Sequence, residues 1–150
     1  MSSEMKDKLN AEFRQAMRDK DTLRRSVLRM VLAAIQNSEI ARRSELSDGD
    51  VLGILSKEVK QHEESIQAFK EGNRVDLMEK EQAELVILLE YLPKQLSREE
   101  IVAEAKKAIE EVGAQGPRDK GKVMPKIIAK LKGQADGKEI NDIVTELLSS

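Results

Sequence analysis

The chain has 150 residues, of which 36% are charged and only 2% are aromatic, so its core must be built from aliphatic side chains. It contains no cysteine, which excludes disulfides, thiolate metal sites and a cysteine nucleophile. The N-terminus is polar and no apolar run approaches the roughly 20 residues that span a bilayer. These features predict a protein with no signal peptide and no membrane partner, located in the cytoplasm.

The formal net charge of −2 conceals an uneven distribution. Residues 4–43 carry ten basic and six acidic side chains, and residues 44–116 carry nine basic and seventeen acidic ones. Residues 117–138 carry seven basic side chains and two acidic ones, a net charge of +5. Two basic zones therefore flank an acidic middle, a pattern that bears on binding partners more than on the fold.

Apolar residues recur every three or four positions in the first part of the chain, which predicts amphipathic helices. The pattern gives one helix over 4–19 and a long one over 23–42, with Asp21 or Thr22 as the N-cap of the second. A third helix follows Ser47, which forms a capping box with Asp50.

The third helix is expected to end at Gly72, a residue suited to the left-handed C-terminal cap, and Asn73 is expected to cap the fourth helix. The fourth helix contains the dense apolar run 85–89, which predicts deep burial of that end.

The stretch from Glu90 to Leu96, Glu-Tyr-Leu-Pro-Lys-Gln-Leu, separates two helical regions. Pro93 disfavours helix in the preceding residue, so the fourth helix should end near Leu92. Ser97 and Glu100 then form a capping box that opens the next helix. We therefore expect Tyr91 to be a packing residue at a boundary, where it anchors the C-terminal part against the long helices.

Three shorter helices are predicted beyond this boundary. The first carries apolar positions from 101 to 112 and stops at Gly113, and the second carries them from 123 to 131. Pro125 would remove a helical hydrogen bond, so the second helix should start near Gly121–Val123 or kink at Pro125. The third opens with a capping box at 136–139.

No alternating β pattern occurs anywhere in the sequence. The prediction is an all-α fold with an N-terminal long-helix hairpin subdomain of about four helices at 1–92. A C-terminal three-helix subdomain follows at 93–150.

The sequence shows no catalytic constellation, cofactor motif or metal-ligand set. His62 is the only histidine, and a structural role with a hydrogen bond to Glu58 is expected for it. Zinc needs three or four ligands, and neither a cysteine nor a second histidine is present. Adjacent carboxylates such as Glu63 and Glu64 do not face one another on a helix, so they are interpreted as solvated charge. We therefore predict no catalytic residue, no cofactor and no metal.

The strongest candidate surface is basic. Lys122, Lys126 and Lys130 are spaced four apart and form one row on a helix. The predicted nucleic-acid-binding set comprises Arg118, Lys120, Lys122, Lys126, Lys130, Lys132 and Lys138. Such a set can hold phosphates, although a merely solubilising face has the same composition. With no aromatic side chain in this zone, contact with RNA would depend on backbone charge and shape.

Five stretches together resemble the YqeY family, whose members are free-standing relatives of the tail domain of the B subunit of glutamyl/aspartyl-tRNA amidotransferase. They are 29–35, 73–77, 90–96, 121–124 and 132–138. The Tyr-Leu-Pro and Ala-Asp-Gly stretches are the most specific of these marks, and Pro125 departs from the expected pattern. The resemblance extends over essentially the whole chain and implies an all-helical fold with a C-terminal three-helix subdomain.

The same resemblance implies an association with tRNA-dependent amidation, a carbon–nitrogen ligase reaction with glutamine as the amide donor. A chain of 150 residues that matches only the tail has no room for the catalytic parts of such an enzyme. The leading hypothesis is a helical accessory module that binds tRNA, an amidotransferase or an aminoacyl-tRNA synthetase. The alternatives are a protein-interaction adaptor that docks through its basic N-terminal helices, without nucleic acid, and an enzyme subunit that acts in trans.

Overall fold

The computed structural model describes residues 3–149, which form seven α-helices and one short 3-10 helix and contain no strand. The helices are α1 (Glu4–Arg18), α2 (Thr22–Arg42), α3 (Asp48–Glu71), α4 (Val75–Leu89), α5 (Arg98–Val112), η1 (Pro117–Asp119), α6 (Lys120–Lys130) and α7 (Gly137–Ser149). The prediction of an all-α fold is confirmed. None of these helices combines the length and the apolar character that a membrane span requires.

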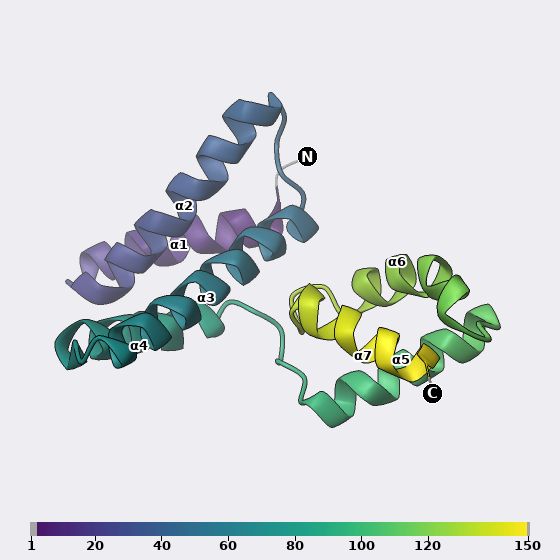
Figure 1. Cartoon of the computed structure of the whole chain (residues 1–150). Coiled ribbons are helices and arrows are strands. Elements are labelled where there is room, and N and C mark those ends of the chain that lie inside the picture. Colours follow the sequence, from purple (N-terminus) through teal and green to yellow (C-terminus); the bar gives the residue numbers. More distant parts are fainter. Residues whose placement is uncertain (1–2, 150) are drawn as a thin grey trace. The chain divides into compact units, whose positions relative to one another are not determined.

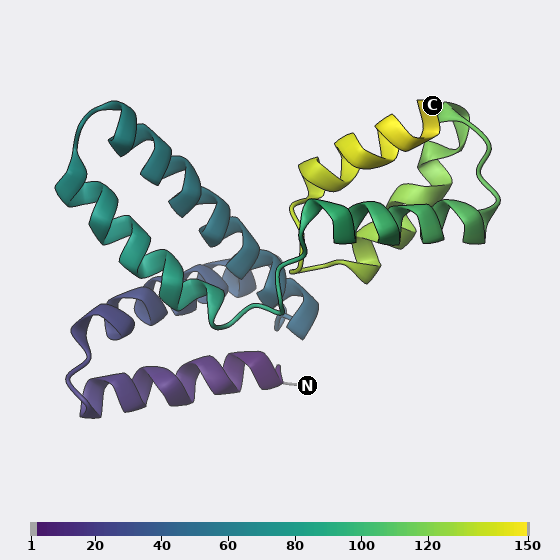
Figure 2. The ribbon, with the colours of Figure 1, turned by 90° about the horizontal axis from the view of Figure 1, so that it is seen from below.

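The chain folds into two compact units, a first unit of Met1–Leu92 and a second unit of Pro93–Ser150. In the first unit, α1 and α2 form one antiparallel hairpin and α3 and α4 form another (Figures 1 and 2). The α3–α4 pair has the most extensive contact in the chain, and α2 packs on both of its members. The second unit is a bundle in which α5, α6 and α7 each pack on the other two.

Local capping contacts explain where most helices begin. The side chain of Asp21 accepts a hydrogen bond from the Arg24 amide, so Asp21 is the N-cap of α2. Ser47 and Ser97 each form the reciprocal capping box that the sequence predicts. These contacts satisfy amide groups that the first helical turn leaves without a partner.

The connection between α3 and α4 differs from the prediction. Gly72 has a φ of −87°, whereas Asn73 has a φ of +55° and is the left-handed residue of this turn. The N-cap of α4 is Arg74, which makes no capping hydrogen bond with its side chain. Asparagine tolerates the left-handed region almost as well as glycine does, and the turn places it there one residue later than expected.

The fourth helix also ends earlier than expected, at Leu89. Leu92 and the two residues before it are held by short-range turn hydrogen bonds, such as that from the Leu92 amide to the Leu89 carbonyl at 3.3 Å. Regular α-helix thus stops three residues before the predicted end, and a tighter turn connects it to Pro93.

In the second unit, α6 begins at Lys120, one residue before the predicted range of starts, and continues through Pro125. The η1 turn leads directly into it, since Lys120 already has helical dihedral angles. Pro125 cannot donate to the carbonyl of Gly121, four residues earlier. Both residues are exposed, so water can satisfy that carbonyl and the helix tolerates the proline.

The cores of the two units differ in composition. The first contains buried aliphatic residues from all four helices together with Tyr91. The second is wholly aliphatic, and its fully buried members include Ile101, Val123, Ile127 and Val144.

Candidate functional site

Two lysines of the predicted row are paired with acidic residues of the neighbouring helix. Lys126 Nζ lies 2.7 Å from Glu111 Oε2, and Lys130 Nζ lies 2.7 Å from Glu104 Oε2. Both carboxylates belong to α5, which packs on α6. The row is therefore part of an alternating basic and acidic surface.

These ion pairs shift the pKa values of Glu104, Glu111 and Lys130. The contact with Lys130 lowers the pKa of Glu104, and the contact with Lys126 lowers that of Glu111. Conversely, the hydrogen bond with Glu104 raises the pKa of Lys130. Glu104 and Glu111 therefore stay charged at neutral pH, and these carboxylates offset the positive charge of the row.

The third lysine of the row, Lys122, lies 3.6 Å from Asp119 Oδ1, and 71% of its side chain is exposed. This pair is longer than the other two, and Asp119 also accepts a hydrogen bond from the Gln115 amide at 2.9 Å. Lys122 is therefore the member of the row that is most accessible to a ligand.

The other four basic residues of the predicted set have no ion-pair partner among residues 3–149. They are Arg118, Lys120, Lys132 and Lys138. Arg118 lies in η1 and Lys120 is the first residue of α6, where the helix dipole adds positive potential. Lys132 lies in the turn after α6, and Lys138 lies in the first turn of α7.

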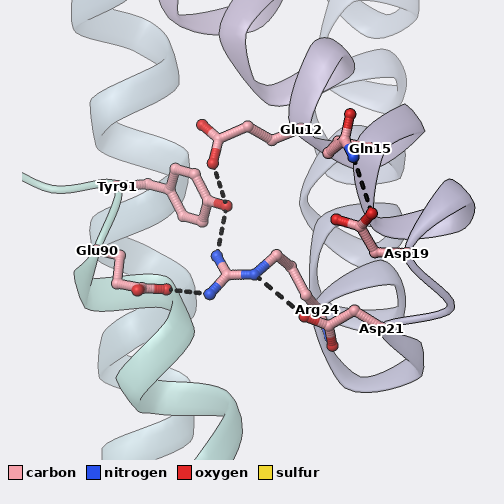
Figure 3. A network of polar contacts seen from close by, with 7 residues as sticks. All are labelled: Glu12, Gln15, Asp19, Asp21, Arg24, Glu90 and Tyr91. Carbon is pink, nitrogen blue, oxygen red and sulfur yellow. Dashed lines mark hydrogen bonds and ion pairs between the residues drawn. The ribbon is translucent and has the colours of Figure 1, made fainter.

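A second polar cluster surrounds Tyr91 in the first unit (Figure 3). The Arg24 guanidinium donates a hydrogen bond of 2.8 Å to the Tyr91 hydroxyl. The same guanidinium forms ion pairs with Glu90 at 2.7 Å and with Asp21 at 3.5 Å. The Tyr91 hydroxyl in turn donates to Glu12 Oε1 at 3.0 Å, so α1, α2 and the end of α4 meet at one tyrosine.

The electrostatics of this cluster favour a structural role. Burial raises the pKa of Tyr91, and the hydrogen bond to Glu12 raises it further against the opposing effect of Arg24. Burial alone would lower the pKa of Arg24, but its hydrogen bonds to Glu90 and Tyr91 raise it instead. Tyr91 is 7% exposed and stays protonated, so it serves as a fixed link between helices.

His62 forms a third polar cluster, between α3 and α4. It is 5% exposed, and its Nδ1 lies 2.9 Å from the main-chain carbonyl of Glu58. The predicted partner is therefore correct, although the contact is to its backbone. Its Nε2 lies 3.3 Å from Glu84 Oε1 and 3.4 Å from Glu81 Oε2.

Burial alone would lower the pKa of His62. The hydrogen bonds to the Glu58 carbonyl and to Glu84, together with the charges of Glu81 and Glu84, raise it instead. Within residues 3–149 these three side chains are also the group whose ligand atoms lie close enough, within 4.8 Å of one another, to hold a metal ion.

Sequence reasoning did not identify Glu12, Arg24, Glu81 or Glu84. Each becomes notable only through a partner on another helix, such as Tyr91 for Glu12, 79 residues away. A local signal does exist at Glu81 and Glu84, which are three residues apart and so share a helix face. It does not reveal that His62 faces them.

Comparisons with known proteins identify the relatives of this chain. The protein named "Altered inheritance of mitochondria protein 41, mitochondrial" from Pyrenophora tritici-repentis is 29% identical over 149 residues, which cover 95% of this chain and 80% of the relative. Proteins of the same name from Lachancea thermotolerans and Saccharomyces cerevisiae are 36% and 34% identical over 85 residues. Those matches cover 56% of this chain and 46% of each relative.

These relatives overturn the predicted cytoplasmic location, because they are named as mitochondrial proteins. Mitochondrial targeting segments are amphipathic and rich in arginine, so a polar composition does not decide the compartment. A family model described as "Yqey-like protein" matches residues 6–148. The chain therefore belongs to the YqeY-like family.

Proposed function

We propose that the protein is a non-catalytic helical module that binds tRNA through the basic side chains of its second unit. The observation that carries this proposal is that four of the seven basic residues in 117–138 have no ion-pair partner among residues 3–149: Arg118, Lys120, Lys132 and Lys138. Lysine and arginine side chains that neutralise phosphates supply most of the affinity in non-specific nucleic-acid binding.

The seven basic residues contribute unequally under this proposal. Lys126 and Lys130 already hold carboxylates at 2.7 Å, and a phosphate would have to displace Glu111 or Glu104 to reach them. The partner-free residues can bind a phosphate without that loss. We therefore expect the partner-free set to carry more of the affinity than the row of lysines on α6.

Recognition at this surface is by charge and backbone shape. The second unit contains no aromatic residue on which a base could stack. Binding should accordingly show little sequence preference and a strong dependence on salt. A partner enzyme, either an amidotransferase or an aminoacyl-tRNA synthetase, would then supply the specificity that this surface lacks. This association is supported by the resemblance of the chain to the amidotransferase tail domain.

A filter-binding titration of the full chain with bulk tRNA at two salt concentrations tests the proposal. The K132E/K138E variant reverses two partner-free lysines, and K126E/K130E reverses two paired ones. We expect micromolar binding that weakens with salt, and a larger loss for K132E/K138E than for K126E/K130E. Two lost phosphate contacts should also reduce the slope of log K against log salt by about 1.5 to 2.

The matched control is K57E/K80E, which makes the same change in charge on exposed positions of α3 and α4. If this control weakens binding as much as K132E/K138E does, net charge rather than the second unit governs the interaction. No binding below about 100 μM at low salt would contradict the proposal outright. A partner captured equally well from RNase-treated lysate would instead support docking on a protein.

A further inference from the structure

The cluster of His62, Glu81 and Glu84 places two carboxylates against one imidazole nitrogen. His62 comes from α3, whereas Glu81 and Glu84 come from successive turns of the same face of α4. Their side chains converge between the two helices that make the most extensive contact in the chain. The cluster lies wholly within the first unit, and the tRNA-binding proposal does not depend on it.

The hydrogen bond at Nδ1 fixes the state of the imidazole ring. A main-chain carbonyl can only accept, so the contact with Glu58 at 2.9 Å places a proton on Nδ1. In the neutral ring, Nε2 then presents a lone pair, and it presents that lone pair to two carboxylates. Three acceptors that face one another in a partly buried site are stabilised by a cation among them, such as a proton on Nε2 or a metal ion.

The arrangement has the features of a metal site. Histidines that bind metals almost always donate their second ring N–H to a carbonyl or carboxylate, which fixes the tautomer and orients the ring. The Glu58 carbonyl makes that contact to His62. The neutral Nε2 together with carboxylate oxygens of Glu81 and Glu84 is a donor set that zinc accepts.

The distances also suit tetrahedral coordination. Zinc bonds of about 2.0–2.1 Å to nitrogen and oxygen place neighbouring ligand atoms about 3.3–3.4 Å apart at tetrahedral angles. The observed separations of Nε2 from the two carboxylate oxygens are 3.3 and 3.4 Å. The three ligand atoms lie within 4.8 Å of one another, so small rotations of the glutamate side chains would complete the geometry.

We propose that His62, Glu81 and Glu84 form a binding site for a divalent transition-metal ion of the zinc class, which links α3 to α4. The imidazole ligand favours this class over magnesium and calcium, which prefer oxygen ligands throughout. The side chains of Glu81 and Glu84 are 24% and 14% exposed, so a water molecule can reach the fourth position. Three protein ligands with an open fourth position are typical of a zinc ion that can also polarise a bound ligand.

The sequence predicts no metal site, because these three ligands come together only in the tertiary structure. Spacing along the chain suggests no metal, because there is one histidine and no cysteine. The α3–α4 hairpin supplies the missing ligands as carboxylates from a helix that begins after a turn. Sequence spacing alone does not reveal this convergence.

Equilibrium dialysis of the full chain against Zn²⁺ tests the site, with Mg²⁺ as the competing ion. We expect one saturable Zn²⁺ site per chain that an equal concentration of Mg²⁺ does not displace. Co²⁺ bound in its place should show the visible absorption of a four-coordinate ion. The variants E81Q and E84Q remove one ligand charge each while keeping the side-chain size. They should weaken Zn²⁺ binding by at least about 10- to 100-fold, which is the typical effect of losing a supporting group around a metal.

The matched control is E79Q, which removes the same charge from an exposed position of α4 outside the cluster. It should bind Zn²⁺ within about twofold of the unmodified chain, because no ligand is lost. The H62N variant should abolish binding, and E81Q decides the matter if H62N fails to fold. If the unmodified chain binds no Zn²⁺, or if E81Q and E84Q bind it as tightly as E79Q does, a proton occupies the site and the proposal is overturned.

Discussion

The two units differ in the kinds of side chain that they bury between their helices. The buried polar side chains among residues 3–149, Ser3 and His62, both belong to the first unit, as does the buried Tyr91. The core of the second unit is made only of alanine, valine, leucine and isoleucine. Its polar contacts lie at helix caps and on the surface, as in the pairs of α5 with α6.

This difference affects how uniquely each unit fixes the register of its helices. Long helices with apolar stripes can slide past one another, and buried hydrogen bonds penalise every register but one. Tyr91 and His62 each fix a position between helices in the first unit. In the second unit, three short helices around one aliphatic core have fewer alternative registers, and shape suffices.

The largest effect is expected from a cavity in the aliphatic core. Ile127 is fully buried, and I127A should reduce the stability of the second unit by about 2–5 kcal/mol. We propose that the first unit folds independently, so its amide NMR signals should persist at denaturant concentrations that unfold the second. The neighbouring I128A, at a side chain that is 40% exposed, should change stability by about 0.5 kcal/mol or less. Simultaneous loss of both sets of signals would contradict independent folding.

The next effect concerns the tyrosine cluster. Y91F removes the hydroxyl that donates to Glu12 and accepts from Arg24. This change leaves the half-buried Glu12 carboxylate without its donor, whereas Arg24 keeps its ion pairs to Glu90 and Asp21. It should cost the first unit about 1–3 kcal/mol, measured by denaturant unfolding. E90Q removes only the negative charge of a half-exposed partner of Arg24 and should cost less than about 1 kcal/mol. Equal effects would mean that the tyrosine hydroxyl contributes no more than a surface pair.

A smaller effect is expected at the helix caps, which the two units share. Ser47 and Ser97 cap α3 and α5 in the same way. S47A and S97A should each reduce the stability of their own unit by about 1 kcal/mol, as judged from separate NMR probes in each unit. S97D keeps an oxygen acceptor and should retain most of the stability. Loss of stability in the unit that was not changed would show that the units are coupled.

The smallest effect is a pH dependence of these caps. Hydrogen bonds from the Ser47 backbone amide and hydroxyl lower the pKa of Asp50, and those from Ser97 lower the pKa of Glu100. Because the folded form binds protons less readily, the contribution is fully present above the ordinary pKa values of 3.8 and 4.5. It is lost as the pH falls through the lower folded pKa values. Denaturation midpoints between neutral and acidic pH should fall less steeply for E100Q than for the unmodified chain.

Features that depend on neighbours within about four residues could be predicted. The capping boxes at Ser47 and Ser97 and the end of α5 at Gly113 follow from local residue types, and the structure confirms them. The turn between α3 and α4 was harder, because both Gly72 and Asn73 tolerate a positive φ. The choice between them depends on how the two helices pack, which no local pattern contains.

The candidate sites also combine local features, which could be predicted, with contacts between distant residues, which could not. The lysine row on α6 follows from helical spacing, but its partners Glu104 and Glu111 lie on α5. Arg24 and Tyr91 are 67 residues apart, and His62 and Glu84 are 22 residues apart. Sequence reasoning found one member of each of these clusters and missed the other.

The sequence by itself determines that this protein is helical, where most helices begin, and that basic residues concentrate in 117–138. These properties arise from side-chain period, capping chemistry and composition, all of which are local. Only the tertiary structure decides which lysines form ion pairs with acidic residues, that Tyr91 joins three helices, and that two carboxylates face His62. Such pairings form because burial of the apolar stripes brings distant helices together, and the charges on their flanks then meet across the interface.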